Sequence, residues 1–134
     1  MNKDTVVVDS SIFVAILKGE ADSASLTERA VSFKRRVMSA ATWFESAMVC
    51  EGVREQGGGD RFERTLASLG IEVIPFTPEQ ARLALSAFKS FGKGQGSKAS
   101  LNFGDCFAYA LAKELEAPLL FKGNDFAQTD LPRA

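Results

Sequence analysis

Four acidic residues stand where the sequence passes from an apolar run into a helix or a turn. Asp9 directly follows a short β-branched run, and Asp105 opens an almost unbroken apolar helical run. Glu45 lies early in another predicted helix, and Asp125 follows the last apolar segment. Carboxylates are rarely buried unless they are paired, cap a helix or bind a cation. Oxygen ligands without histidine or thiolate suit a hard ion, so this set predicts a site for Mg²⁺ or Mn²⁺.

Each of these acids also has a simpler local explanation. Asp9 and Asp105 have the positions of helix caps. Glu45 has capping-box spacing from Thr42, and Asp125 is a common turn residue. However, two carboxylates about 5 Å apart repel by roughly 3 kcal/mol at an effective dielectric constant near 20. Four acids at one edge of a sheet therefore favour a bound cation, and carboxylate-held Mg²⁺ typically activates water in phosphoryl chemistry.

The elements that must position these acids follow an alternating pattern of short apolar strands and helices. That pattern is typical of a parallel sheet covered by helices on both faces, in which ligands bind at the carboxyl ends of the strands. One helix is predicted from Thr42 to about Glu55, and another begins with Thr77 as its cap and Pro78 in its first turn. We predict strands at 5–8, 37–39, 71–76 and 118–121, and a fragment of a fifth at 130–131.

Composition narrows the chemistry further. The 134 residues are expected to form one domain, 1–134, and the net charge of −1 gives no bulk electrostatic argument for nucleic acid. The absence of histidine excludes a Ser-His-Asp or Cys-His site, a histidine-bearing zinc site and a paired-histidine route for cutting RNA. Cys50 and Cys106 each lie in an apolar helical pattern, which indicates buried, reduced thiols. With neither a signal peptide nor a membrane-spanning stretch evident, we expect a cytoplasmic protein.

Four motifs together resemble the PIN-domain family, and more closely the VapC ribonuclease toxins of prokaryotic toxin–antitoxin modules. The resemblance spans essentially the whole chain and implies a three-layer α/β/α sandwich with a central parallel sheet of four to five short strands. It also implies Mg²⁺- or Mn²⁺-dependent cleavage of RNA and inhibition by a VapB-type antitoxin. The motifs are Asp9-Ser10-Ser11, Ala41-Thr42-Trp43-Phe44-Glu45, Asn102-Phe103-Gly104-Asp105-Cys106-Phe107-Ala108-Tyr109-Ala110 and Leu120-Phe121-Lys122-Gly123-Asn124-Asp125-Phe126.

The resemblance also implies roles for individual residues. Asp9 and Asp105 would be the principal metal ligands. Glu45 and Asp125 would complete the catalytic quartet, directly or through water. Asn124 stands where many relatives carry a second acid, which leaves open whether one or two ions bind.

The substrate side rests on fewer residues. Lys93 and Lys98 in a glycine-rich segment, and Lys122 near Asp125, are candidates for phosphate contacts, although the pattern favours ordinary solvated lysines. Trp43 and Phe44 are candidates for stacking a base, or for packing in the core or an interface. The wide apolar arc of their helix fits contact with the sheet on one side and a second subunit on the other, so we expect a homodimer.

Three other classes of protein compete with a nuclease. A receiver-like, Mg²⁺-binding phospho-signalling domain needs paired acids after the first strand and an acceptor aspartate after the third. Here the first strand offers Asp9 alone, and the third ends in 75–77 without an acid. A haloacid-dehalogenase-like phosphatase needs Asp-x-Asp, which Asp9-Ser10-Ser11 does not provide. A PIN-like scaffold that binds without cutting remains the non-enzymatic alternative, and metal-dependent cleavage would distinguish it from a nuclease.

Overall fold

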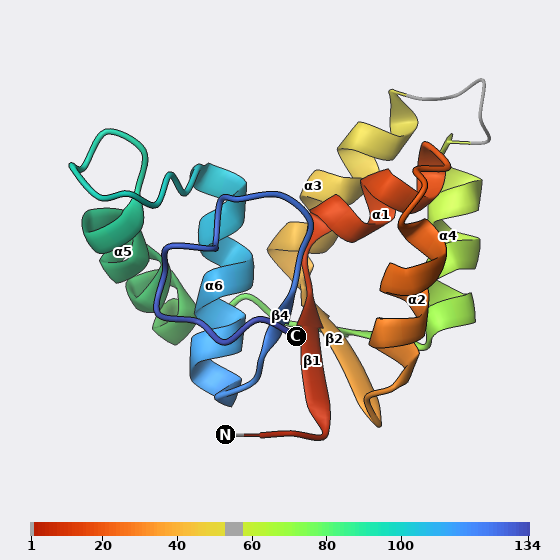
Figure 1. Ribbon diagram of the computed structural model, residues 1–134, viewed down its shortest axis with the longest axis horizontal. Coiled ribbons are helices and arrows are strands. Elements are labelled where there is room, and N and C mark those ends of the chain that lie inside the picture. The colour runs from red at the N-terminus through yellow and green to blue at the C-terminus, as the bar shows by residue number, and fades with distance from the viewer. Residues whose placement is uncertain (1, 53–57) are drawn as a thin grey trace.

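The computed structural model describes residues 2–52 and 58–134, which form one parallel sheet with helices on both faces (Figure 1). Its strands are β1 (Thr5–Val8), β2 (Arg35–Ser39), β3 (Ile71–Ile74) and β4 (Leu119–Leu120). Their order across the sheet is β3-β2-β1-β4, and every neighbouring pair is parallel. In the central strand, Val7 pairs with Val37 on one side and Leu119 on the other.

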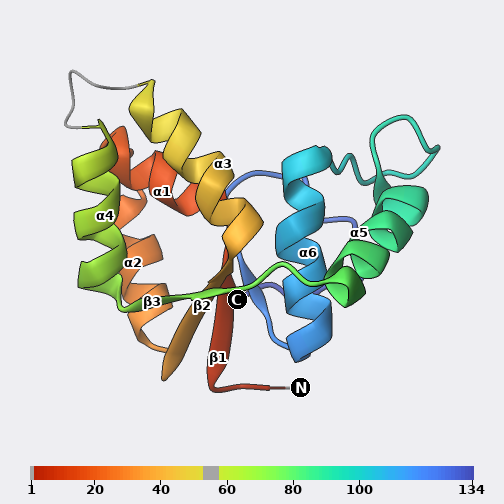
Figure 2. The ribbon, with the colours of Figure 1, turned by 180° about the vertical axis from the view of Figure 1, so that it is seen from behind.

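The helices are α1 (Ser10–Leu17), α2 (Ser23–Val31), α3 (Ala40–Glu51), α4 (Gly58–Leu69), α5 (Pro78–Phe91) and α6 (Phe103–Leu115). The first four lie on one side of the sheet, and α5 and α6 lie on the other (Figure 1, Figure 2). Because side chains alternate across a strand, Val6 and Val8 pack in the core under α1, α2 and α4, whereas Val7 packs with α5 and α6. The predicted three-layer α/β/α sandwich with a parallel sheet is confirmed.

The start of helix α3 differs from the prediction. Helix α3 begins at Ala40, because Ser39 at the end of β2 already caps it, its hydroxyl accepting the Ala41 N–H at 3.1 Å. Thr42 is therefore buried inside the helix, and the predicted capping box with Glu45 is wrong. The predicted end of that helix near residue 55 lies outside the described residues.

The outer strands are shorter than predicted. Strand β3 stops at Ile74, because Pro75 has no N–H to donate to a ladder. The predicted fragment at 130–131 is instead a single parallel bridge between Leu119 and Arg133. In contrast, Thr77 caps α5 as predicted, accepting the Gln80 N–H at 3.2 Å. None of the helices in residues 2–52 and 58–134 is long and apolar enough to cross a membrane.

Candidate active site

Asp9 lies at the carboxyl end of β1 and is the N-cap of α1. Its Oδ2 accepts the Ser11 N–H at 3.1 Å, so the capping role is real. The side chain is nevertheless only 4% exposed, and its Oδ1 has no hydrogen-bond partner within the described residues. Burial raises the pKa of Asp9, and hydrogen bonds from Ser11 and the Ser10 N–H oppose that rise. A buried carboxylate with one unpaired oxygen is expensive unless something else satisfies it.

Asp105 occupies the first turn of α6 and forms a complete capping box with Asn102. Each of the two side chains accepts the other residue's backbone N–H at 2.9 Å. The pKa of Asp105 is raised to about 8, chiefly by burial and also by the charges of Asp9 and Asp125. The hydrogen bond from the Asn102 N–H acts in the opposite direction. A hydrogen bond between the Asp105 and Asp125 carboxyl groups, which needs a shared proton, raises this pKa as well. Asp105 is therefore both a helix cap and a member of a crowded acidic cluster.

Glu45 reaches the cluster from α3. Its carboxylate lies against Gly104 in the first turn of α6, so close that a Cβ added at Gly104 would overlap it. Burial raises the pKa of Glu45, as does the charge of Asp9, while a hydrogen bond with the Ser10 side chain favours the charged form. A glycine in the first turn of α6 is thus what lets the Glu45 carboxylate approach the positive end of the helix.

Asp125 comes from the exposed loop that follows β4. Its carboxyl group shares a hydrogen bond with that of Asp105, and its charge also raises the pKa of Asp9. The structure therefore brings together all four acids that the sequence singled out, from the end of β1, the second turn of α3, the first turn of α6 and the loop after β4. Whether they act as metal ligands or catalytic groups remains a prediction.

The donor set fits a hard divalent ion. It consists of carboxylate oxygens, one of which is buried and unpaired within the described residues. The pKa values of Asp9, Glu45 and Asp105 are raised chiefly by burial and further by the charges of neighbouring acids, and a cation would relieve both effects. In the described part of the chain, no three acidic or cysteine side chains already converge as a finished coordination shell. Asp9 and Asp105 are fixed by their caps, so the longer Glu45 side chain or the loop-borne Asp125 would turn toward the ion.

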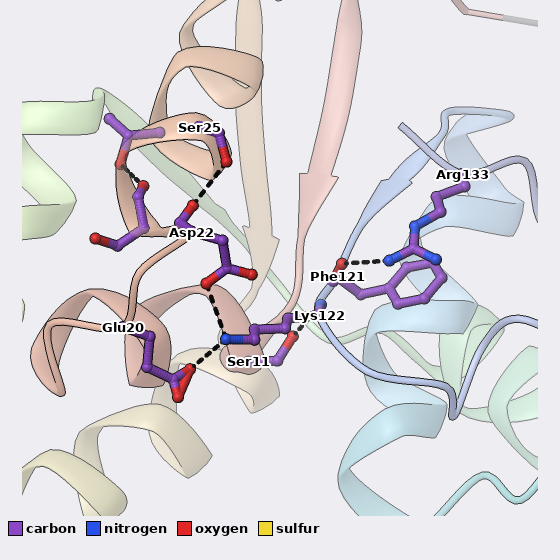
Figure 3. A network of polar contacts seen from close by, with 9 residues as sticks. Ser11, Glu20, Asp22, Ser25, Phe121, Lys122 and Arg133 are labelled. Carbon is purple, nitrogen blue, oxygen red and sulfur yellow. Dashed lines mark hydrogen bonds and ion pairs between the residues drawn. The ribbon is translucent and has the colours of Figure 1, made fainter.

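The three candidate lysines lie in different settings. Lys122 extends its ammonium group to Glu20 at 2.7 Å and Asp22 at 2.8 Å, and these ion pairs raise its pKa (Figure 3). Lys93 and Lys98 are exposed in the loop between α5 and α6. The sequence interpretation placed Lys122 beside the acids as a phosphate contact, without foreseeing its ion pairs.

The two aromatic candidates, Trp43 and Phe44, differ in burial. Trp43 is half-buried and packs against Phe62 of α4, with ring centroids 6.0 Å apart. Phe44 is 60% exposed on α3. Sequence reasoning missed the contributions of Ser10 and Gly104, although a glycine inside an apolar helical run is a recognisable sign of close approach.

Comparison with known proteins gives the family. The PIN domain model matches residues 6–131. Ribonuclease VapC28 of Mycobacterium tuberculosis is 40% identical over 129 residues, which cover 96% of this chain and 97% of the relative. Ribonuclease VapC of Mycolicibacterium smegmatis is 39% identical over 126 residues, covering 94% and 97%.

Two solved structures are similar in fold at low sequence identity. Mycobacterium tuberculosis VapC20, a Sarcin-Ricin loop cleaving toxin, has a TM-score of 0.71 at 16% identity and covers 96% of this chain and 98% of its own. VapBC2 from Rickettsia felis, bound to a promoter DNA fragment, has a TM-score of 0.70 at 14% identity and covers 97% of both chains. With a family match over almost its whole length and relatives near 40% identity, this chain belongs to the PIN domain family and to the VapC ribonucleases within it.

Proposed function

We propose that this chain is a metal-dependent endoribonuclease and the toxin of a type II toxin–antitoxin pair. The observation that carries the proposal is the acidic cluster itself. Asp9 and Asp105 are almost fully buried, lie next to Glu45 and Asp125, and leave one carboxylate oxygen unpaired within the described residues. In a chain of the VapC ribonucleases, this arrangement supports metal-assisted phosphodiester hydrolysis.

Each acid has a distinct part in this proposal. Asp9 and Asp105, held by their helix caps, would be the principal ligands of Mg²⁺ or Mn²⁺. Glu45 and Asp125 would complete the site directly or through water. When bound, the divalent ion activates water and stabilises the leaving oxygen. The Ser11 N–H in the first turn of α1 and the Asn102 N–H at the N-cap of α6 each donate to one of these acids, which partly opposes the rise in their pKa values.

The absence of histidine determines which product ends we expect. Without a histidine pair to form a cyclic phosphate, water attacks phosphorus directly and leaves 5′-phosphate and 3′-hydroxyl ends. The test is to incubate the purified protein with total RNA, with EDTA, and with EDTA followed by excess Mg²⁺ or Mn²⁺. We expect EDTA to abolish cleavage and either ion to restore it. Products ending in 2′,3′-cyclic phosphate, or cleavage that survives EDTA, would contradict the proposal.

The partner in this proposal is a VapB-type antitoxin, and both proteins would act in the cytoplasm. An antitoxin segment lying across the acids, with a basic side chain toward them, would offset the mutual repulsion of the carboxylates. Co-expression with the product of the neighbouring gene should give a complex that purifies together and does not cleave RNA. A neighbouring product that neither binds nor inhibits would count against this assignment.

A homodimer is the remaining part of the proposal, and it rests on one apolar face. Leu85 and Phe88 of α5 and Phe103 of α6 are exposed and line a hollow of about 600 Å³, and Phe44 and Met48 are exposed on α3. Single exposed apolar residues are ordinary, but several large ones around one apolar hollow are typical of an interface. Replacing Leu85 by Glu should convert a dimeric solution mass into a monomeric one, whereas a wild-type monomer would refute the dimer.

A further inference from the structure

Lys122 sits in a polar network that joins two segments far apart in the sequence. Its ammonium group lies between the carboxylates of Glu20 and Asp22, which belong to the turn between α1 and α2 (Figure 3). Its backbone N–H donates to the Ser11 hydroxyl at 3.0 Å. Lys122 therefore ties the chain after β4 to both ends of α1.

The same segment is held on its other side by aromatic packing. The Phe121 and Phe126 rings lie 5.0 Å apart and are both buried. Arg133 lies over the Phe121 ring at 4.3 Å and donates to the Phe121 carbonyl (Figure 3). Between these anchors, the chain turns at Gly123, whose φ of 104° belongs to the left-handed region. Asp125 is thus carried on a short exposed turn with fixed ends.

This arrangement assigns the network a purpose beyond stability. Half-exposed ion pairs contribute little to the free energy of folding, so Glu20, Asp22 and Lys122 matter chiefly for where they hold the chain. We propose that Lys122, clamped by Glu20 and Asp22, is a positioning residue that holds the 122–125 turn so that the Asp125 carboxylate meets Asp105. The proposal rests on the proposed nuclease function, because it gives Asp125 a place in that site.

The alternative is that Lys122 contacts an RNA phosphate. Two carboxylates already neutralise its ammonium group, so such a contact would have to break two ion pairs before it gained one. The two roles also make opposite predictions for the partners. If Lys122 binds phosphate, removing the charges of Glu20 and Asp22 should strengthen RNA binding. If Lys122 is a positioning residue, the same change should displace Asp125.

The experiment compares three variants with the wild-type chain: Lys122→Met, the double variant Glu20→Gln/Asp22→Asn, and Lys18→Met. Lys18 is an exposed lysine at the end of α1 and serves as the control for loss of a charge nearby. Each is measured for kcat and KM on RNA, for the salt dependence of RNA binding, and for Mn²⁺ affinity by thermal shift. The last measurement does not depend on activity.

For a positioning role, Lys122→Met and the double variant should both lower kcat by on the order of tenfold to a hundredfold, because a misplacement near 1 Å has that effect. Both should weaken Mn²⁺ binding and leave KM and the salt dependence unchanged, while Lys18→Met behaves as wild type. Their triple combination should be no worse than either, because all three act through one clamp.

Two results would overturn the inference. One is a Lys122→Met variant that raises KM and reduces the salt slope while the double variant improves binding, which is the signature of a phosphate contact. The other is unchanged Mn²⁺ affinity and kcat in both clamp variants. An inactive wild-type protein would refute the proposed function instead, and the Mn²⁺ affinities would still test the clamp.

Discussion

Replacing Gly104 by Ala should remove activity without weakening the fold. Gly104 is the second residue of α6, and an added Cβ would overlap the Glu45 carboxylate. That carboxylate is the far end of a flexible side chain, so it can move aside at little cost to packing. Alanine also stabilises helical backbone by about 0.5–1 kcal/mol relative to glycine. We therefore expect unfolding free energy equal to or slightly above that of wild type.

The loss of activity follows from the displacement of one acid. The Glu45 carboxylate would shift by at least the depth of a methyl group, and a misplacement near 1 Å costs on the order of 10²-fold in rate. The assay measures kcat on RNA beside a urea melt, for Gly104→Ala, for Glu45→Ala and for both together. If the alanine acts through Glu45, it should cost nothing further when Glu45 is already Ala. A Gly104→Ala variant with full activity, or one that loses activity only by unfolding, would refute the reasoning.

Two further predictions concern pH and salt. Burial raises the pKa of Asp105 from its ordinary value of 3.8 to about 8, so between these pH values the folded chain binds the proton and the unfolded chain does not. Stability of the metal-free protein should therefore fall as pH rises through that range, more steeply in wild type than in Asp105→Asn, as chemical denaturation at several pH values would show. Replacing Lys93 and Lys98 by Ala should raise KM, leave kcat unchanged and lower the salt slope of RNA binding by about one per lysine. Salt dependence equal to that of wild type would mean that neither lysine contacts an RNA phosphate.

The sheet and the four acids could be predicted because their signals are local. A β-branched run that ends in Asp9 reads as a buried strand followed by a cap, and an acid opening an apolar run identifies Asp105 in the same way. Parallel topology then places strand ends at a common edge, which is why residues so distant in sequence were expected together.

The start of α3 could not be predicted because two residues compete for the cap. Ser39 and Thr42 are both good N-caps, and only the exact end of β2 decides between them. The capping-box spacing from Thr42 therefore does not explain Glu45, although it offered the simplest local role for this acid. The Glu45 carboxylate is directed to α6 by Gly104, not to its own helix start.

Long-range ion pairs leave no local signal. Glu20 and Asp22, the ion-pair partners of Lys122, lie 102 and 100 residues earlier in the chain. The spacing of Lys122 from Asp125 therefore indicated that it lies near the acids, but not that it pairs with Glu20 and Asp22. Gly104 is different, because a glycine within an apolar helical run could have been recognised as a position of close approach.

The most direct test of the proposed metal site uses Asp9→Asn and Asp105→Asn. Asparagine is nearly as good a helix cap as aspartate, so the caps that the structure shows should survive both changes. Relief of like-charge repulsion should leave metal-free stability unchanged or raised by about 1 kcal/mol.

The measurement is a thermal melt with and without Mg²⁺, beside an RNA cleavage assay on the same samples. At about one hundred times its dissociation constant, Mg²⁺ should stabilise wild type by about 2.7 kcal/mol and each variant much less. Cleavage should fall by orders of magnitude in both variants while they remain folded. Variants that keep full cleavage, or a wild-type melt that Mg²⁺ does not shift, would mean that Asp9 and Asp105 are helix caps and nothing more.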